Sequence, residues 1–370
     1  MTTTFLLFGV PLLALAGGVA AWWLYGRRNR DSGVAAVSVK RSTAVSRPAE
    51  PAAAQEDPRP APPGMTGREI LARMYATAFE ERTTGDRRVD PGAGIHGRVA
   101  RSAIAVLSRI HPGSHYAPRR PQLLPQLLNV VNDEDSSGRE IAAIIARDPA
   151  LAGNLLRIAN SALYRVRPEP IENIERAVAM IGTDGLRHLI AVALMQPVLN
   201  ERGGTFGRLP SVVWEHTLLS SVAAAEYARH VERIDPFSAQ MLGLLHGLGS
   251  IVVVQVLRDS YEKYADIAPD PARIGQFLEQ WSAPTAQRLQ QGWDLPVRIA
   301  PALEDQRRDV PLEELGPLGR SLRIGRVVGA AAMLHRLRRI DVDTVFVLMQ
   351  QGLGLREELA ARIWERLSRT

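Results

Sequence analysis

The feature that most constrains the fold of this chain is a series of helix start signals, each followed by apolar residues at helical spacing. Ser137 and Glu140 can form a capping box, in which each side chain binds a backbone N–H in the first turn of a helix. Asp148-Pro149 and Asp235-Pro236 each place a capping aspartate before a proline, whose fixed φ suits the first helical position. Apolar residues three or four apart follow these signals: Ile141, Ile144 and Ile145; Leu151, Leu155 and Ile158; Met241, Leu244, Leu245 and Leu248. No alternating pattern indicates a partner strand, so we predict an all-α fold.

The first thirty residues hold a long stretch without charged side chains, which runs from Phe5 to Tyr25. At ~1.5 Å per helical residue it spans about 30 Å, the thickness of the hydrocarbon layer of a membrane. Its C-terminal end is aromatic, and three arginines follow it: Arg27, Arg28 and Arg30. Because basic residues favour the cytoplasmic side, we predict one uncleaved membrane span over residues 5–25, with the N-terminus outside and the remaining chain in the cytoplasm. A cleaved signal peptide, the alternative, would carry its positive charge before the apolar stretch.

Four segments follow from changes in composition along the chain. Residues 1–30 are predicted to be the transmembrane anchor, and residues 31–65 a disordered linker whose proline- and alanine-rich sequence buries too little apolar surface to order itself. Residues 66–115 contain two apolar helical patterns and are predicted to be a helical leader, either an accessory element or a part that packs on the main domain. The main helical domain is predicted over residues 116–370.

The composition argues against several kinds of site. The chain has no cysteine, which excludes disulfides, thiolate metal ligands and cysteine nucleophiles. Its net charge of +6 comes from arginines interleaved with acidic residues, without the basic and aromatic clusters that bind nucleic acids, so nucleic acid is not an expected partner. The sequence also lacks a G-x-x-x-x-G-K-[ST] loop and a G-x-S-x-G turn, which argues against phosphate-loop NTPases and serine hydrolases.

The main domain carries a long, ordered set of motifs. Residues 124–194 read LPQLLNVVNDE, then IAAIIARDPALAGNLLRIANSALYR, then IENIERAVAMIGTDGLRHLIAVAL. Further on come Trp214-Glu215-His216, the sequence GLLHGLGS at residues 243–250, and Trp293 followed by Leu295-Pro296. Together these motifs resemble the HDOD family, whose name stands for HD-related output domain. The resemblance implies a helical bundle similar to that of the HD-type metal-dependent phosphohydrolases. It also implies a signalling or regulatory role, and the predicted span would place this role on the cytoplasmic side of a bacterial inner membrane.

The resemblance implies a comparison with the catalytic HD-type phosphohydrolases, in which an adjacent His-Asp pair binds a divalent metal that activates water. The corresponding residues here are His246-Gly247, and glycine has no ligand atom. Where relatives often show paired histidines this chain has Glu304-Asp305-Gln306, and where a late aspartate is expected, at residues 324–330, it reads IGRVVGA. We therefore predict a degenerate site with no catalytic residue, no metal and no other cofactor. Gly247 and Gly249 together predict close backbone packing or a helix irregularity instead.

His216 and His246 are the two ligand-type residues that remain, and we predict that they mark a relic metal or ligand pocket. The alternative for each is a packed or hydrogen-bonded core histidine. Asn160 and Ser161 are further binding candidates, with a helix-ending cap as the alternative role.

These features predict a non-catalytic signalling module that binds a partner signalling protein or a nucleotide second messenger, near the relic pocket or on an exposed apolar helix face. The alternative is a metal-dependent phosphohydrolase acting on a nucleotide or cyclic dinucleotide, which would need a further ligand such as Glu215, Glu304 or Asp305. A third reading is a membrane scaffold that recruits proteins and binds no small ligand. No oligomeric state is predicted.

Overall fold

The computed structural model describes residues 65–79, 94–111, 113–117, 137–147, 149–160, 170–177, 206–264, 267–291 and 297–368, together with residues 123, 126, 127 and 130. The predicted membrane span and the linker up to residue 64 lie outside these residues, as do Asp148, Ser161 and residues 292–296. All described residues belong to one compact unit, Asp57–Thr370.

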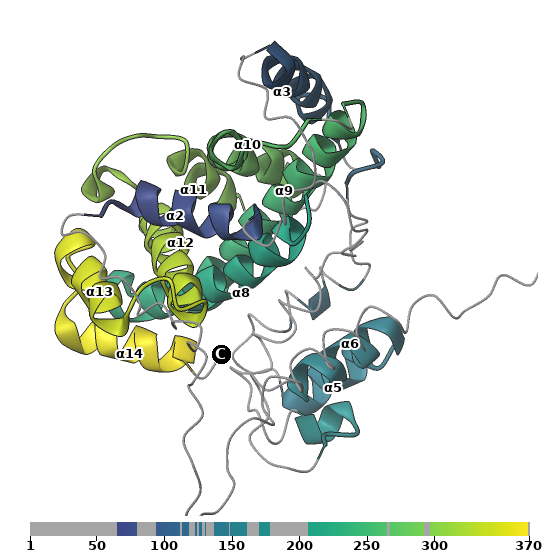
Figure 1. Ribbon diagram of the computed structural model, residues 1–370. Helices are drawn as coiled ribbons and strands as arrows, with labels where there is room; N and C mark the ends of the chain where they lie inside the picture. The colour runs from purple at the N-terminus through teal and green to yellow at the C-terminus, as the bar shows by residue number, and fades with distance from the viewer. Residues whose placement is uncertain are drawn as a thin grey trace, which may run out of the picture. The chain divides into compact units, whose positions relative to one another are not determined.

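The described residues form helices joined by turns, with no strand among them, which confirms the predicted all-α class (Figure 1). The longer helices are α2 (Gly67–Ala76), α3 (Gly94–Leu107), α5 (Gly138–Ile145), α6 (Pro149–Ala159), α8 (Leu209–Tyr227), α9 (Pro236–Glu262), α10 (Pro271–Gln291), α11 (Ile299–Asp305), α12 (Pro317–Arg336), α13 (Val342–Val347) and α14 (Glu357–Ser368). Short 3₁₀ turns lie at Thr77–Phe79 and Leu312–Glu314, and π-helical turns at Ala228–Glu232 and Leu348–Gly352.

The predicted start signals begin helices at the expected residues. The Ser137 hydroxyl accepts a hydrogen bond from the Glu140 N–H at 3.2 Å, at the start of α5. The Asp235 carboxylate accepts from the N–H groups of residues 237 and 238 at 3.1 and 3.0 Å, and Pro236 is the first residue of α9. These bonds satisfy N–H groups that a helix leaves unpaired in its first turn, so the helix boundaries follow from local chemistry.

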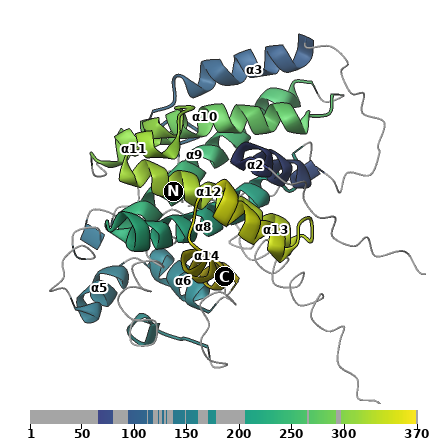
Figure 2. The ribbon, with the colours of Figure 1, turned by 90° about the vertical axis from the view of Figure 1, so that its left-hand side faces the viewer.

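Helix α8 packs closely against both α9 and α12, and glycines allow the close approach (Figures 1 and 2). A Cβ atom placed on Gly243 of α9 would lie 2.9 Å from the Cα of Ser221, and one placed on Gly329 of α12 would lie 2.7 Å from the Ser220 nitrogen. Both distances are shorter than packed atoms tolerate. Helix α8 is therefore held between two neighbours at positions that suit glycine alone.

Helix α9 is a core helix. Among the described residues it is long and apolar enough to cross a membrane, but 94% of its apolar window is buried inside the bundle. Leu244, Leu245 and Val253 are fully buried, and they point in different directions around the helix axis. A helix that is apolar on all sides is typical of the centre of a large helical domain.

The leader helices pack on the main domain, which favours the second of their two predicted roles. Helix α2 contacts α10 and α12, and α3 contacts α9 and runs along the outside of the bundle beside α10 (Figure 2). The Nδ1 atom of His96 lies 2.8 Å from the hydroxyl of Tyr261, and the Tyr116 hydroxyl donates to the Asp259 carboxylate at 2.8 Å. Both links join the segment before residue 117 to the C-terminal half of α9.

Candidate functional site

The two histidines predicted from the motifs come from neighbouring helices, His216 from α8 and His246 from α9. Their exposed fractions are 5% and 4%, so both rings lie in the interior. They are close enough that a charge on His216 would lower the pKa of His246. The structure therefore brings the predicted pair together.

His216 is held by two contacts. Its Nε2 atom lies 2.8 Å from the carbonyl oxygen of Arg326, so Nε2 must carry the hydrogen and donate it. The ring meets that of Tyr75 edge to face, with 6.3 Å between centroids. Burial lowers the pKa of His216 to about 4, and this effect exceeds the opposing one of the Arg326 carbonyl. His216 is therefore neutral at pH 7.

His246 lacks such a partner at one nitrogen. Its Nε2 atom is buried and makes no hydrogen bond with a described residue. Burial first, and then the positive charge of Arg326 and the nearby His216, hold the pKa of His246 well below its usual value. The site thus contains two neutral imidazoles on adjacent helices.

A buried arginine that sequence reasoning missed stands beside them. Arg326 of α12 is 5% exposed, and its guanidinium binds the carboxylate of Glu279 on α10 at 2.5 Å. The hydroxyl of Tyr75 on α2 donates to the same carboxylate at 3.3 Å. Burial alone would lower the pKa of Arg326, but the Glu279 carboxylate reverses this effect and the pKa is raised. A permanent cation therefore sits within this group of residues, which we call the buried polar cluster: Tyr75, His216, His246, Glu279 and Arg326.

The aspartate position of the motif has no room for a side chain. A Cβ atom on Gly247 would lie 2.0 Å from the Oγ1 of Thr217 and 2.1 Å from its Cγ2. A Cβ atom on Gly249 would likewise lie 2.5 Å from the carbonyl oxygen of Ser282. These contacts confirm the close packing predicted from the two glycines, with α8 on one side of α9 and α10 on another.

The three acidic residues considered as further metal ligands, Glu215, Glu304 and Asp305, interact with groups outside the buried polar cluster. Glu215 and Glu304 are each about half exposed and form an ion pair with an arginine, at 3.6 and 2.9 Å respectively. Asp305 accepts a hydrogen bond from the Gly316 N–H at 2.9 Å. Within the described part of the chain, no three residues of metal-ligand type form a group that could hold an ion.

The buried polar cluster does not fit a hydrolytic divalent metal. Such a metal prefers carboxylate oxygens among its ligands, whereas the cluster offers two imidazoles and one carboxylate already neutralised by Arg326. The guanidinium would also repel a second cation placed next to it. We therefore assign no metal chemistry to these residues.

Asn160 has a local structural role in this fold. It directly follows the last residue of α6, and its amide donates to the carbonyl oxygens of Leu156 and Ile171 at 2.9 and 2.7 Å. Its own oxygen accepts from the Ile171 N–H at 2.7 Å. Asn160 thus ties the end of α6 to residues 170–177, as the helix-cap alternative describes. Ser161 lies outside the described residues.

The helical bundle and the pair of histidines on adjacent helices define an HD-like helical domain. The family model of the HDOD domain matches residues 117–308, more than half of the chain, and the chain belongs to the HDOD family.

Several solved structures are similar to this chain at low sequence identity. The structure of an HDOD domain protein of unknown function from Geobacter sulfurreducens is 19% identical, covers 74% of this chain and 97% of its own, and has a TM-score of 0.47. A proposed metal-dependent phosphohydrolase from Shewanella amazonensis SB2B is also 19% identical, with coverage of 73% and 98% and a TM-score of 0.46. A proposed signal transduction protein from Marinobacter aquaeolei VT8 is 17% identical, with coverage of 83% and 64% and a TM-score of 0.48.

Among curated proteins, an uncharacterized protein of Treponema pallidum (strain Nichols) is 24% identical over 237 residues, which is 61% of this chain. The aligned part is 44% of the Treponema protein, so this chain spans less than half of that relative. The family match thus makes this chain a signalling-related, HD-like domain protein.

Proposed function

We propose that this chain is a non-catalytic signalling module. Residues 5–25 anchor it in the bacterial inner membrane, and the helical domain binds a partner signalling protein or a nucleotide messenger on the cytoplasmic side. The observation that carries the proposal is the Arg326 guanidinium, which lies beside His216 and His246 and is paired with Glu279.

The charge balance of the buried polar cluster supports this proposal. A bound divalent metal supplies positive charge that polarises substrate and activates water. Here Arg326 supplies one fixed positive charge to the same interior, and Glu279 balances it. For charges ~4 Å apart at an effective dielectric constant of ~20, repulsion between two unit charges is about 4 kcal/mol, and a divalent ion would roughly double it. Arg326 thus gives the site charge without the open coordination position that hydrolysis needs.

The burial of the cluster supports binding at another place. His216, His246 and Arg326 are each no more than 5% exposed, so a ligand could reach them only after the helices moved apart. We propose that recognition uses the outer surface of the bundle, while the cluster maintains the shape of the domain.

The first test is metal content and hydrolysis by the full chain, purified in detergent without chelator. We expect far less than one manganese, iron or zinc ion per chain by elemental analysis, and no hydrolysis of nucleotides or cyclic dinucleotides after addition of these metals. A stoichiometric metal that disappears in His246→Ala, together with hydrolysis, would identify a phosphohydrolase and overturn the proposal.

A further inference from the structure

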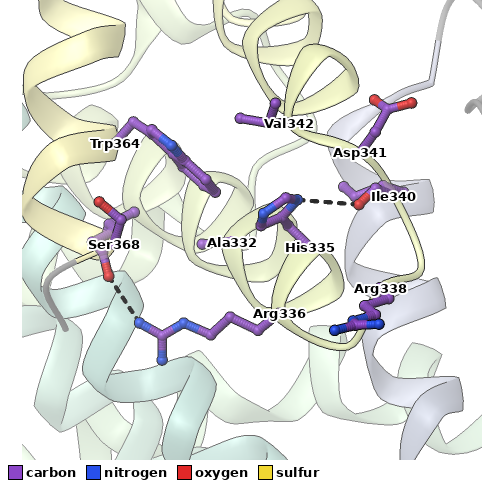
Figure 3. A pocket seen from close by; sticks show the side chains of 10 residues that line it. Ala332, His335, Arg336, Arg338, Ile340, Asp341, Val342, Trp364 and Ser368 are labelled. Carbon is purple, nitrogen blue, oxygen red and sulfur yellow. Dashed lines mark hydrogen bonds between the residues drawn. The ribbon is translucent and has the colours of Figure 1, made fainter. Parts of the chain in front are cut away.

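A hollow of about 670 Å³ lies at the C-terminal end of α12, where this helix meets the start of α13 and the end of α14 (Figure 3). Its volume falls within the ~300–1,000 Å³ that is usual for small-molecule sites. The chemically distinctive residues around it are His335, Arg336, Arg338, Asp341 and Trp364. None of them belongs to the buried polar cluster.

Arg338 has an unusual backbone for its residue type. Its φ is 56°, in the left-handed region that favours glycine, and it forms the turn that ends α12. Its N–H donates to the His335 carbonyl at 2.8 Å, and the next N–H donates to the Leu334 carbonyl at 2.8 Å. Glycine is the common residue at this position of a helix end. Glycine would fit this backbone without strain, so the Arg338 side chain can be removed without disturbing the turn.

The Arg338 side chain is exposed, and no described residue forms a hydrogen bond or ion pair with it. By contrast, Arg336 donates to the Leu367 carbonyl at 2.8 Å and forms an ion pair with Glu215. The lining carboxylate of Asp341 accepts from the Thr344 N–H at 2.7 Å and caps α13. Among the described residues, Arg338 is therefore a cation without a partner at the edge of the hollow, whereas the Asp341 carboxylate is already hydrogen-bonded.

The Trp364 ring lines the hollow on the side of His335 that lies away from Arg338 (Figure 3). The Trp364 ring is partly buried and held edge to face by His335, at 5.1 Å between centroids, and by Phe346, at 6.2 Å. The Nδ1 atom of His335 lies 3.2 Å from the Ile340 carbonyl oxygen, so it donates and leaves Nε2 as an acceptor. A fixed indole offers a flat ligand a surface for stacking that loses little entropy on binding.

We propose that this hollow binds a nucleotide, with its base against Trp364 and its phosphate at Arg338. The inference rests on the proposed function and names the ligand class and the place. A nucleotide combines a flat aromatic ring with an anion a short distance away, which matches the indole at one side of the hollow and the guanidinium at the other. The phosphate would also provide the missing partner of Arg338.

The test is calorimetric titration of the full chain in detergent with GMP, AMP and cyclic di-GMP, and separately with inorganic phosphate. We expect at least one nucleotide to bind in the micromolar range and phosphate alone to bind far more weakly. Arg338→Gly should weaken nucleotide binding about tenfold or more, because a charged hydrogen bond is lost. Glycine suits the left-handed backbone, so this variant should fold normally.

The matched control is Arg233→Gly. Arg233 has a φ of 55°, at the end of the π-helical turn Ala228–Glu232, and does not line the hollow. This control removes the same side chain from the same kind of backbone and should leave binding unchanged. Absence of nucleotide binding at millimolar concentration, an equal affinity for phosphate, or binding unaffected by Arg338→Gly would each overturn the proposal.

The outcome can be separated from that of the proposed function. If the chain contains a metal and hydrolyses nucleotides, but Arg338→Gly still weakens binding, then the hollow stands and the non-catalytic role fails. If nucleotide binding instead depends on His246 and not on Arg338, the inference about the hollow fails.

Discussion

Two buried neutral histidines make the domain sensitive to acid. Burial lowers the pKa of His216 to about 4, and it holds that of His246 well below its usual value. An unfolded chain protonates each histidine below about pH 6.5. Between these limits the unfolded state binds more protons than the folded state, so the free energy of unfolding falls as the pH falls. Stability from this source is complete above about pH 6.5 and is lost progressively towards pH 4.

A substitution at His246 can isolate one of the two contributions. The contribution of His216 to the free energy of unfolding should fall by roughly 2 kcal/mol between pH 7 and pH 5. We expect His246→Leu to reduce the acid sensitivity of the whole domain and to change stability little at pH 7, because the buried Nε2 makes no hydrogen bond. Thermal unfolding of the full chain from pH 7.5 to 4.5 would measure this. An unchanged dependence of the unfolding midpoint on pH in this variant would contradict the account.

At the level of helices, the contact between α8 and α9 excludes any side chain at residue 247. We expect Gly247→Ala to destabilise the domain by about 1–3 kcal/mol or more, because its Cβ would lie 2.0 Å from the Thr217 hydroxyl oxygen. We expect Gly247→Asp, which restores a His-Asp pair to the sequence, to be at least as destabilising and to bind no metal. Chemical denaturation and elemental analysis would measure both effects.

A glycine in an open part of a helix provides the control. No atom of a described residue lies within 4 Å of a Cβ placed on Gly153 of α6. Replacing it by alanine should stabilise the domain by up to ~1 kcal/mol, because alanine loses less backbone entropy in a helix. If Gly247→Ala behaved like Gly153→Ala, the close α8–α9 contact would be wrong.

The sequence predicted those elements whose signals are local. The caps at Ser137 and Asp235 and the helical spacing of α9 depend on residues near one another in the chain. Close packing at Gly247 could be predicted because glycine has no side chain, but its partner Thr217 on α8 could not. The histidine pair was predicted from the motifs of the family. The role of Arg326 was not, although an arginine between glycines in an apolar segment was a visible signal.

The reason lies in where the partners of Arg326 come from. Tyr75 and Glu279 come from α2 and α10, which lie far apart in the sequence, and both residues have types that are common on helix surfaces. Only the packing of these helices shows that Arg326 points inward. The hollow beside Trp364 was missed for the same reason, since it needs the end of α12 and α14 to meet.

At the scale of the whole molecule, the proposed membrane location rests on the sequence of residues 5–25 and not on α9. Both segments are apolar, but α9 is buried in the bundle and has no lipid-facing surface to offer. We expect the full chain to sediment with membranes and to resist extraction by salt and alkali, because an apolar span of about 30 Å is inserted essentially irreversibly.

Deletion of residues 1–30 should move the chain to the soluble fraction, and a green fluorescent protein fused to its C-terminus should fluoresce in the cytoplasm. A chain that stays in the membrane after this deletion would assign the membrane contact to another segment. A fusion protein that is translocated and does not fluoresce would indicate the opposite orientation.

The five helices that supply the buried polar cluster have a consequence for dividing this protein into parts. Residues 117–308, which carry the family match, include His216, His246 and Glu279, while Tyr75 precedes this segment and Arg326 follows it. A fragment cut at the limits of the match would keep the carboxylate and both imidazoles but lose the guanidinium and the phenol. Its interior would be open to water and carry an uncompensated negative charge. We therefore expect the smallest part of this chain that folds to be larger than the segment that the family model matches.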